Sequence, residues 1–300
     1  MSFIVEYIVL LFCFIKECFV LYYPKISVLM VSYNRGNVIE QAISSVVNQT
    51  YKNIELVVID GGSEDGTLDV LNKYNSSIKY WCSEKDNGIY HAANKALEQI
   101  SGDYFIWLST DDSFVSEDVI ECAVKKLDES IDVLSGWIYW VNNNGYEYLG
   151  KNTHAVDKEK YSGGMIPTEG VFWRTDLVKK YKFDESYKVA ADYKLFLQLY
   201  YSDNVKFKYI DLPITYFAVG GISSVQSVCI EEDNRIYREL NLLQFVDRHL
   251  RCSITQKIGI SIRNAFHNMF FFGILQNVRD KIFRKKHHCN NKICRWCGRK

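Results

Sequence analysis

The chain has 300 residues, of which 48% are hydrophobic, so it is long enough for one large domain with additions and apolar enough for a substantial core. Its 36 basic and 36 acidic side chains cancel, and the formal net charge is zero. This balance gives no electrostatic reason to expect a nucleic-acid partner, and we predict none. Nine cysteines without a compact framework indicate thiols in a reducing compartment rather than a secreted disulfide scaffold.

The N-terminal segment is apolar but interrupted. Residues 7–15 and 19–23 are short apolar runs, and Lys16 and Glu17 separate them. A membrane-spanning helix needs about 20 uninterrupted apolar residues, and a signal peptide needs a small-residue cleavage site, which is missing before Pro24. Three interpretations stay open: an interfacial or extra packed helix, a marginal membrane anchor, and a start codon assigned too early.

Three short apolar runs in the first part of the chain are typical of buried parallel strands. Each is followed at once by polar or acidic residues: 26–31 by 32–34, 55–59 by 60–63, and 104–108 by 109–112. In open α/β sheets, ligands bind beyond the carboxyl ends of such strands. We therefore expect one crevice that receives a tyrosine and several carboxylates.

Helices are predicted between these strands. Apolar periodicity indicates helices over 37–49, 67–74 and 90–100 and a short strand over 78–81. The resulting order, β-α-β-α-β-α-β, implies right-handed crossovers and a mostly parallel sheet in an α/β fold.

The pattern changes after residue 116. The sequence predicts a helix over 117–127, a hairpin from 132–141 and 146–149, a helix over 175–181, a helix that opens at 190–192, and strands over 205–210 and 214–219.

Residues 258–282 mix large apolar side chains with arginine and lysine. Such a helix suits either the headgroup region of an anionic membrane or packing on the folded domain with a solvated basic end.

The acidic residues after the strands are the first candidates for a site. Asp111 and Asp112 follow a buried strand, where paired carboxylates can hold Mg²⁺ or Mn²⁺ and thereby neutralise a diphosphate. Asp60 follows another strand and is placed to accept a hydrogen bond from a nucleobase imide. In isolation, a helix cap or a solvated turn explains the pair equally well, and a turn before Gly61 explains Asp60. Their occurrence in one sheet favours a binding site.

Residues 26–112 resemble the nucleotide-binding half of the glycosyltransferase family 2 enzymes, which share the GT-A fold. The segments that carry the resemblance are 27–34, 44–51, 55–67, 86–91 with 94–95, and 102–104 with the acidic turn at 109–112. Residues 86–90, 183–185 and 191–193 are most similar to the colanic-acid-type transferases, a subgroup that builds bacterial surface polysaccharides. The likeness covers about residues 25–225 and neither end of the chain.

The resemblance implies a domain organisation. We expect a Rossmann-like, mostly parallel sheet with an acceptor-side α+β half and C-terminal helices. The predicted regions are a hydrophobic extension over 1–24, a GT-A domain over 25–225, a helical region over 226–286 with membrane contact left open, and a basic Cys/His tail over 287–300. The GT-A domain would divide into a nucleotide-sugar-binding half, 25–115, and an acceptor half, 116–225.

The family's donor-binding residues carry over by position. Ser32, Tyr33 and Asp60 would hold the base and ribose of a nucleotide-sugar donor, with UDP expected as the nucleotide. Asp86 would lie beside them. Ser109 stands where the family has the first acid of its Asp-x-Asp motif, and its hydroxyl would hydrogen-bond the ribose. This departure puts the metal affinity in doubt.

The metal and catalytic roles carry over in the same way. Asp111 matches the second acid of the motif and would bind Mn²⁺ or Mg²⁺, with Asp112 in support. Asp192 matches the catalytic base, since an acceptor hydroxyl must lose its proton as it attacks the anomeric carbon and one carboxylate suffices for this. Direct displacement would invert the anomeric centre. The alternative for Asp192 is a favourable interaction with the helix dipole in a first helical turn.

Two further segments resemble the family more loosely. Residues 169–174 are similar to an acceptor-side segment that often carries glutamine, which Glu169 replaces here. Trp173 in this segment would fill the core or stack on a sugar ring. Residues 220–223 resemble a late motif near the donor phosphates.

The resemblance implies an inverting glycosyltransferase, of hexosyl or N-acetylhexosaminyl type, that uses a glycan or lipid-linked acceptor in surface-polysaccharide synthesis. We expect it in the cytoplasm, with peripheral contact at the inner face of the membrane as an open point. The alternatives are a noncatalytic nucleotide- or carbohydrate-binding module, which Ser109 keeps open, and a nucleotidyltransferase. A dinucleotide-binding oxidoreductase is disfavoured, because no Gly-x-Gly-x-x-Gly pattern follows the first strand.

The C-terminal tail carries a partial metal-binding pattern. Its candidates are His287, His288, Cys289, Cys294 and Cys297. The spacing Cys-x-x-Cys, with a third cysteine and two histidines nearby, is typical of zinc ligands, but a second Cys-x-x-Cys pair is missing. A zinc site and a disordered basic tail both stay open.

Overall fold

The computed structural model describes residues 22–142, 145–150, 167–220, 226–243, 285–287, 294 and 296. The N-terminal apolar runs lie almost wholly outside these residues. The amphipathic segment predicted at 258–282 lies outside them as well.

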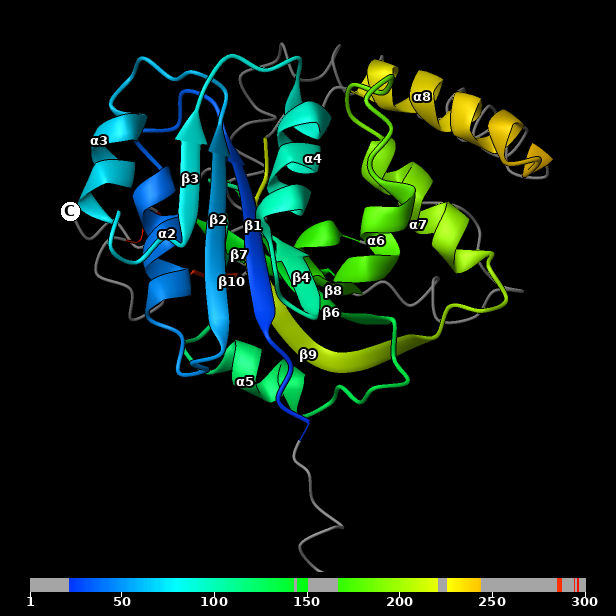
Figure 1. Ribbon diagram of the computed structural model, residues 1–300, viewed down its shortest axis with the longest axis horizontal. Helices are drawn as coiled ribbons and strands as arrows, with labels where there is room; N and C mark the ends of the chain where they lie inside the picture. The colour runs from blue at the N-terminus through cyan, green and yellow to red at the C-terminus, as the bar shows by residue number, and fades with distance from the viewer. Residues whose placement is uncertain are drawn as a thin grey trace, which may run out of the picture.

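Four parallel strands form the first half of the sheet. They are β1 (Ile26–Ser32), β2 (Ile54–Asp60), β3 (Tyr80–Ser83) and β4 (Tyr104–Trp107), in the spatial order β4-β1-β2-β3. The connecting helices are α2 (Ile39–Val47), α3 (Thr67–Lys73) and α4 (Ile89–Gln99). The predicted β-α-β order is therefore confirmed. In Figure 1 the arrowheads of β1, β2 and β3 point to the same upper edge, where their carboxyl ends lie.

Helices cover both faces of this sheet because alternate strand residues point to opposite sides. Leu29 and Val57 join a buried cluster with α4, α7 (Ala191–Tyr200) and Val178 of α6 (Thr175–Tyr181). Val28 and Met30 join a second cluster with α2, α3 and α5 (Val119–Val124). The result is a three-layer α/β/α arrangement in which the parallel strands are covered on both sides (Figure 1).

The second half of the sheet is mainly antiparallel. Its strands are β8 (Val171–Arg174) beside β4, then β6 (Val133–Val141), β7 (Tyr146–Gly150) and β10 (Lys285–Lys286). The short β5 (Ser113–Phe114) pairs with β9 (Phe207–Ala218), which also runs parallel to β6. Figure 1 shows β9 as a long curved strand that passes below the parallel core. The predicted hairpin at 132–149 is confirmed as β6 and β7.

One sequence prediction in this region is wrong. Two strands were expected at 205–210 and 214–219, but β9 (Phe207–Ala218) is continuous and passes through Pro213. The proline is accommodated by a bulge in the pairing with β6, because the register of β6 against β9 shifts on both sides of Trp137. Gly136 permits the close approach, since a Cβ there would lie 2.5 Å from the carbonyl oxygen of Leu212.

Two elements complete the described fold. The 3₁₀ turn η2 (Thr168–Gly170) precedes β8, and α8 (Gln226–Glu239) packs on α7. The start of α7 at residue 191 agrees with the sequence prediction. Among the described helices, none combines the length and the hydrophobicity that a membrane crossing requires.

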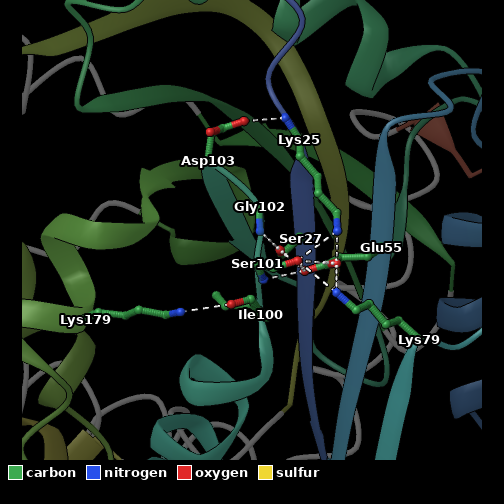
Figure 2. A network of polar contacts seen from close by, with 9 residues as sticks. All are labelled: Lys25, Ser27, Glu55, Lys79, Ile100, Ser101, Gly102, Asp103 and Lys179. Carbon is green, nitrogen blue, oxygen red and sulfur yellow. Dashed lines mark hydrogen bonds and ion pairs between the residues drawn. The ribbon is translucent and has the colours of Figure 1, made fainter.

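A buried carboxylate ties the strands together at their amino ends (Figure 2). Glu55 of β2 accepts hydrogen bonds from Lys25, from Lys79 at 2.7 Å, from the Ser27 hydroxyl at 2.7 Å and from the Ser101 amide at 2.6 Å. Burial alone would raise the pKa of Glu55, but these donors lower it to about 2. The group is therefore a fully compensated charge that joins β1, β2 and the start of β4.

Candidate active site

The ends of three parallel strands lie side by side. Ser32 is in register with Asp60, and Asp60 is in register with Ser83. The Ser32 hydroxyl is buried and has no hydrogen-bond partner among the described residues. A buried hydroxyl in that state costs free energy unless a ligand or water satisfies it, so Ser32 is a candidate ligand contact.

Asp60 organises the loop that follows β2. Its carboxylate is buried and accepts hydrogen bonds from the amides of Gly62 (3.1 Å) and Ser63 (2.8 Å) and from the hydroxyls of Ser63 and Ser83 (both 2.6 Å). The Ser63 hydroxyl in turn accepts from the Asn34 amide at 2.7 Å. Asp60 thus fixes the loops after β1 and β2 together. A direct contact with a nucleobase, as predicted, would require the groups around it to open, and this role stays a prediction.

Tyr33 and Asp86 flank a bare stretch of backbone at Gly61. Tyr33 is 62% exposed, which is unusual for an aromatic ring beside the sheet. A Cβ on Gly61 would lie 2.7 Å from the Asp86 carboxylate and 3.4 Å from the Tyr33 ring, so a side chain there would displace Asp86. Asp86 is held in place by the Gly88 amide, which donates to it at 2.9 Å. An exposed ring and a carboxylate over glycine backbone form a surface on which a flat heterocycle can lie.

The turn after β4 separates its two adjacent acids. Asp111 is partly exposed, whereas Asp112 is 1% exposed and accepts a hydrogen bond from the Ala218 amide at 2.8 Å. Asp112 therefore anchors the turn on the end of β9, while Asp111 reaches the surface. Ser109, at the start of the turn, donates from its hydroxyl to Glu169 at 3.2 Å.

Glu169 is an ionisable group that the sequence analysis identified only as a replacement for the family's glutamine. It lies in η2, is buried, and has hydrogen-bonding neighbours in Ser109 and Thr168. Burial raises the pKa of Glu169 to about 7, and the negative charge of Asp192 contributes to this rise. A glutamate that holds its proton near neutral pH is an unusual feature and is typical of functional sites.

Asp192 lies in the first turn of α7 and is held by the side chain of a tyrosine. Its Oδ1 accepts from the Tyr90 hydroxyl and from the Tyr193 amide, both at 2.9 Å. The Tyr90 ring is positioned by Phe183 and Trp107, with centroids 5.9 and 6.2 Å away. Burial raises the pKa of the Asp192 carboxyl, and the two donors oppose that rise. Burial and Asp192 raise the pKa of Tyr90 as well, so it stays a hydroxyl donor.

Helix α8 adds two acids that the sequence did not suggest. Glu232 accepts hydrogen bonds from the amides of residues 188–190 at 2.7 to 3.0 Å and so fixes the segment that leads into α7. Burial raises the pKa of Asp233 to about 7, and the charges of Asp192 and Glu232 add to the effect. From sequence alone, an acidic helix of this composition is expected to lie on the solvated surface. The position of Glu232 and Asp233 near Asp192 becomes apparent only from the packing of α8 on α7.

The structure thus forms two linked groups of side chains. The first contains Tyr33, Asp60 and Asp86 at the ends of β1 and β2. The second contains Ser109, Glu169, Asp192 and Asp233, which are joined by hydrogen bonds or by charge interactions. Residues 86–90 connect the two groups, because Asp86 lies at Gly61 and Tyr90 contacts Asp192. No group of three or more acids, histidines or cysteines in the described residues is arranged to hold a metal ion.

Comparison with known proteins identifies the family. Residues 27–190 match the sequence profile of Glycosyl transferase family 2, and the chain belongs to this family. An uncharacterized glycosyltransferase of Rickettsia typhi is 31% identical over an alignment of 219 residues, and the match covers 65% of this chain and 62% of that protein. The chain thus spans about three fifths of the length of that relative.

Solved structures with the same fold are more distant in sequence. Staphylococcus aureus TarS 1-349 in complex with UDP-GlcNAc matches with a TM-score of 0.59 at 22% identity, over 73% of this chain and 66% of that one. The mannosyltransferase PcManGT from Pyrobaculum calidifontis, in complex with GDP-Man and Mn²⁺, matches with a TM-score of 0.58 at 17% identity, over 73% and 65%. The predicted GT-A α/β fold is confirmed.

Proposed function

We propose that the protein is an inverting glycosyltransferase that moves a sugar from a UDP-sugar to a hydroxyl of a glycan or lipid-linked acceptor. The observation that carries the proposal is the placement of Asp192. Its carboxyl is held by Tyr90, has a raised pKa, and is connected through residues 86–90 to the surface around Tyr33. Family membership supports the reaction class, and the surroundings of Asp192 support the proposal that it is the base.

The donor side would bind the nucleotide. The exposed Tyr33 ring would stack on the base, Asp86 would accept a hydrogen bond from the base or the ribose, and the free Ser32 hydroxyl would find a partner there. The two structural neighbours are named as complexes with UDP-GlcNAc and GDP-Man, which supports a nucleotide-sugar donor. We propose UDP because the residues at 32, 33 and 60 resemble the uracil-binding set of the family.

A divalent ion, Mn²⁺ or Mg²⁺, fits the residues at the turn after β4. Such ions are commonly bound with nucleotides through one or two carboxylates, with the substrate phosphates as further ligands. Asp111 offers one partly exposed carboxylate, and Asp112 would support it by fixing the turn on β9. The ion would supply positive charge to the departing diphosphate. Ser109 would contact the ribose in place of the first acid of the motif.

Asp192 would act as the catalytic base. Tyr90 and the Tyr193 amide donate to Oδ1, so we assign Oδ2 to the acceptor hydroxyl. A base is most effective when its pKa approaches the working pH, and burial moves the pKa of Asp192 in that direction. The hydroxyl oxygen would attack the anomeric carbon, the bond to the diphosphate would break, and the proton would pass to Asp192. One displacement of this kind inverts the anomeric centre.

Contacts between distant segments support the surface-polysaccharide subgroup. Asn94 donates to the Phe183 carbonyl at 2.9 Å and to Glu185 at 2.8 Å, and it accepts from the Phe183 amide at 3.0 Å. Tyr90 joins the same region to Asp192. The segments that resemble the subgroup therefore form one unit around the base. We propose an acceptor glycan at this unit, in the cytoplasm at the inner face of the membrane.

The test is a donor screen with purified full-length protein. Candidate UDP- and GDP-sugars are supplied with Mn²⁺, and release of the nucleoside diphosphate is measured with and without acceptor. Asp111→Ala should lose most of the Mn²⁺-dependent nucleotide binding and retain its melting temperature. Release of pyrophosphate would instead indicate a nucleotidyltransferase. Nucleotide binding without turnover on any donor and acceptor would indicate a noncatalytic module and would contradict the proposal.

A further inference from the structure

Helix α8 holds the segment that carries Asp192, and three of its side chains do so from one face. Glu232, Arg235 and Glu239 are spaced three and four residues apart, so they lie on the same side of the helix. All three contact residues in the stretch 186–194, and Figure 1 shows α8 beside α7. The family profile matches residues 27–190 and does not extend to α8. Family membership therefore assigns no role to these contacts.

Glu232 binds the backbone that enters α7. Its Oε1 accepts from the Lys188 amide at 2.7 Å, and its Oε2 accepts from the amides of Val189 and Ala190, both at 3.0 Å. Ala190 is the N-cap of α7, and its methyl group cannot hold the start of the helix through a hydrogen bond. Hydrogen bonds from amides to a carboxylate are among the stronger ones in proteins. Glu232 therefore fixes the backbone directly before Asp192 from a different helix.

The other two side chains hold neighbouring parts of the same segment. Arg235 donates to the Ser186 hydroxyl at 2.8 Å and lies over the Tyr187 ring, 4.2 Å from its centroid. Glu239 accepts from the Tyr187 hydroxyl at 2.9 Å and from the Lys194 ammonium at 2.6 Å. Helix α8 thus contacts the chain both before and after the residue proposed as the base.

Buried side chains join the two helices beneath these polar contacts. Ile236 and Tyr237 of α8 are fully buried, and the Tyr237 hydroxyl lies 2.8 Å from the Tyr193 hydroxyl. Tyr193 follows Asp192 directly, and its amide donates to the Asp192 carboxylate. A shift of α8 would therefore move the backbone on which that carboxylate is mounted.

We propose that α8 positions the catalytic base and that Glu232 is the residue through which it does so. By holding the amides of 188–190, Glu232 keeps the Asp192 carboxyl where it reaches the acceptor hydroxyl. This inference rests on the proposed function, in which Asp192 is the base. Glu232 is a positioning residue and does not contact substrate. A displacement of about 1 Å at a reacting group can lower a rate about 100-fold, so turnover should depend on this anchor.

The charge of Glu232 also acts on Asp192. Burial is the main cause of the raised pKa of Asp192, two hydrogen-bond donors oppose it, and the negative charge of Glu232 adds to it. Removing that charge alone should therefore lower the pKa of Asp192. The titratable groups that interact with Asp192 are Tyr90 of α4, Glu169 of η2, and Cys229, Glu232 and Asp233 of α8.

The test compares Glu232→Ala and Glu232→Gln in the full-length chain, with Glu231→Gln as the matched control. Glu231 is the exposed neighbour in α8, so its change removes an equal charge and leaves the hydrogen bonds to 188–190 in place. Glu232→Ala should lower kcat about 10- to 100-fold with the donor KM unchanged. Glu232→Gln keeps one acceptor oxygen and should recover part of kcat, while the acid limb of its pH–rate profile moves to lower pH. Glu231→Gln should match the wild type in all of these.

Hydrogen exchange gives a readout that does not need turnover. The amides of 188–190 should exchange at least about tenfold faster in Glu232→Ala than in the wild type or in Glu231→Gln. Unchanged exchange would overturn the proposal. A lower melting temperature with normal kcat and a normal pH profile would also overturn it, because α8 would then serve stability alone.

A second variant covers the case in which Glu232→Ala does not fold. Glu232→Gln with wild-type kcat and an unmoved acid limb would then overturn the proposal. These outcomes are distinct from a failure of the proposed function. Normal turnover in Asp192→Asn would remove the base assignment and with it this inference, whereas an inactive Asp192→Asn beside a fully active Glu232→Ala would sink the role of α8 alone.

Discussion

Two buried glutamates at opposite edges of the sheet have opposite electrostatic surroundings. Glu55, at the amino edge, is surrounded by two lysines, two serine hydroxyls and an amide, and its pKa is lowered to about 2. Burial raises the pKa of Glu169, beside the end of β4, to about 7; the like charge of Asp192 adds to this rise, and the hydroxyls of Ser109 and Thr168 oppose it. The same residue type is thus a stabilising charge at one edge (Figure 2) and a carboxyl with a raised pKa at the other.

The difference depends on the partners that the fold supplies. At the amino edge, the negative charge of Glu55 is balanced by the ammonium groups of Lys25 and Lys79, and the Ser101 amide donates a hydrogen bond to it. At the carboxyl edge, neither Glu169 nor Asp192 forms an ion pair within the described residues, and Asp233 adds a further acid. Clustered carboxyls with raised pKa values are typical of functional sites. The comparison therefore supports the proposal that the reacting centre lies at the carboxyl edge.

The largest expected effect concerns Asp192. Asp192→Asn should lower turnover by about 10²- to 10⁴-fold, because the acceptor hydroxyl loses its base. Nucleotide affinity and melting temperature should stay near the wild-type values. The matched variant Tyr90→Phe removes one donor, so the pKa of Asp192 should rise and the acid limb of the pH–rate profile should move to higher pH. Normal turnover in Asp192→Asn would show that the base is assigned wrongly.

The next effect is on stability and concerns the other edge. Glu55→Gln should destabilise the fold at pH 7 by roughly 3 kcal/mol, as the lowered pKa implies, with turnover of the folded enzyme unchanged. In the wild type this contribution is fully present above the unfolded-state pKa of about 4.5 and is lost as the pH falls toward 2. Urea unfolding across this range measures it. The control Glu40→Gln breaks an exposed pair with Lys73 and should cost less than about 1 kcal/mol.

Glu169 should show the opposite dependence on pH. Its pKa is raised in the folded state, so folding favours the protonated form, and wild-type stability should fall as the pH rises from about 4.5 to about 7. Glu169→Gln should remove this fall and be more stable than the wild type at pH 8, with no difference near pH 4. Unfolding by urea at several pH values is the measurement. A variant that is less stable than the wild type at pH 8 would contradict the raised pKa.

The smallest effect is on donor affinity. Tyr33→Ala should weaken nucleotide binding about tenfold, since the stacking of a base on an aromatic ring contributes roughly 1–3 kcal/mol. Tyr33→Phe keeps the ring and should bind with nearly wild-type affinity. Calorimetric titration with nucleoside diphosphate compares the two. Equal losses in both variants would indicate that the hydroxyl, rather than the ring, makes the contact.

The sequence predicted elements in both halves of the sheet. The expected strand at 26–31 is β1 at 26–32, and the expected helix at 175–181 agrees with α6 at both ends. Apolar runs and periodicity are local signals, so they identify such elements directly. The single strand β9 escaped prediction because Pro213 is a local breaker, whereas the shift in β6 that accommodates it lies more than 70 residues away.

The candidate site was predicted only in part. Resemblance to the family indicated Tyr33, Asp111 and Asp192, because those residues lie in recognisable segments. It did not indicate the raised pKa values of Glu169 and Asp233, because these depend on the packing of η2 and α8 around Asp192. Burial of a carboxyl is a tertiary property and has no short-range signal in the chain.

The most direct test of the central claim is a crystal structure of Asp192→Asn with a UDP-sugar and Mn²⁺, in which the donor stays intact. We predict the base against Tyr33 and Asp86, the diphosphate and the ion at Asp111, and the side chain of residue 192 facing the anomeric carbon from the opposite side. A donor bound away from the ends of β1, β2 and β4, or residue 192 on the same side as the diphosphate, would contradict the account.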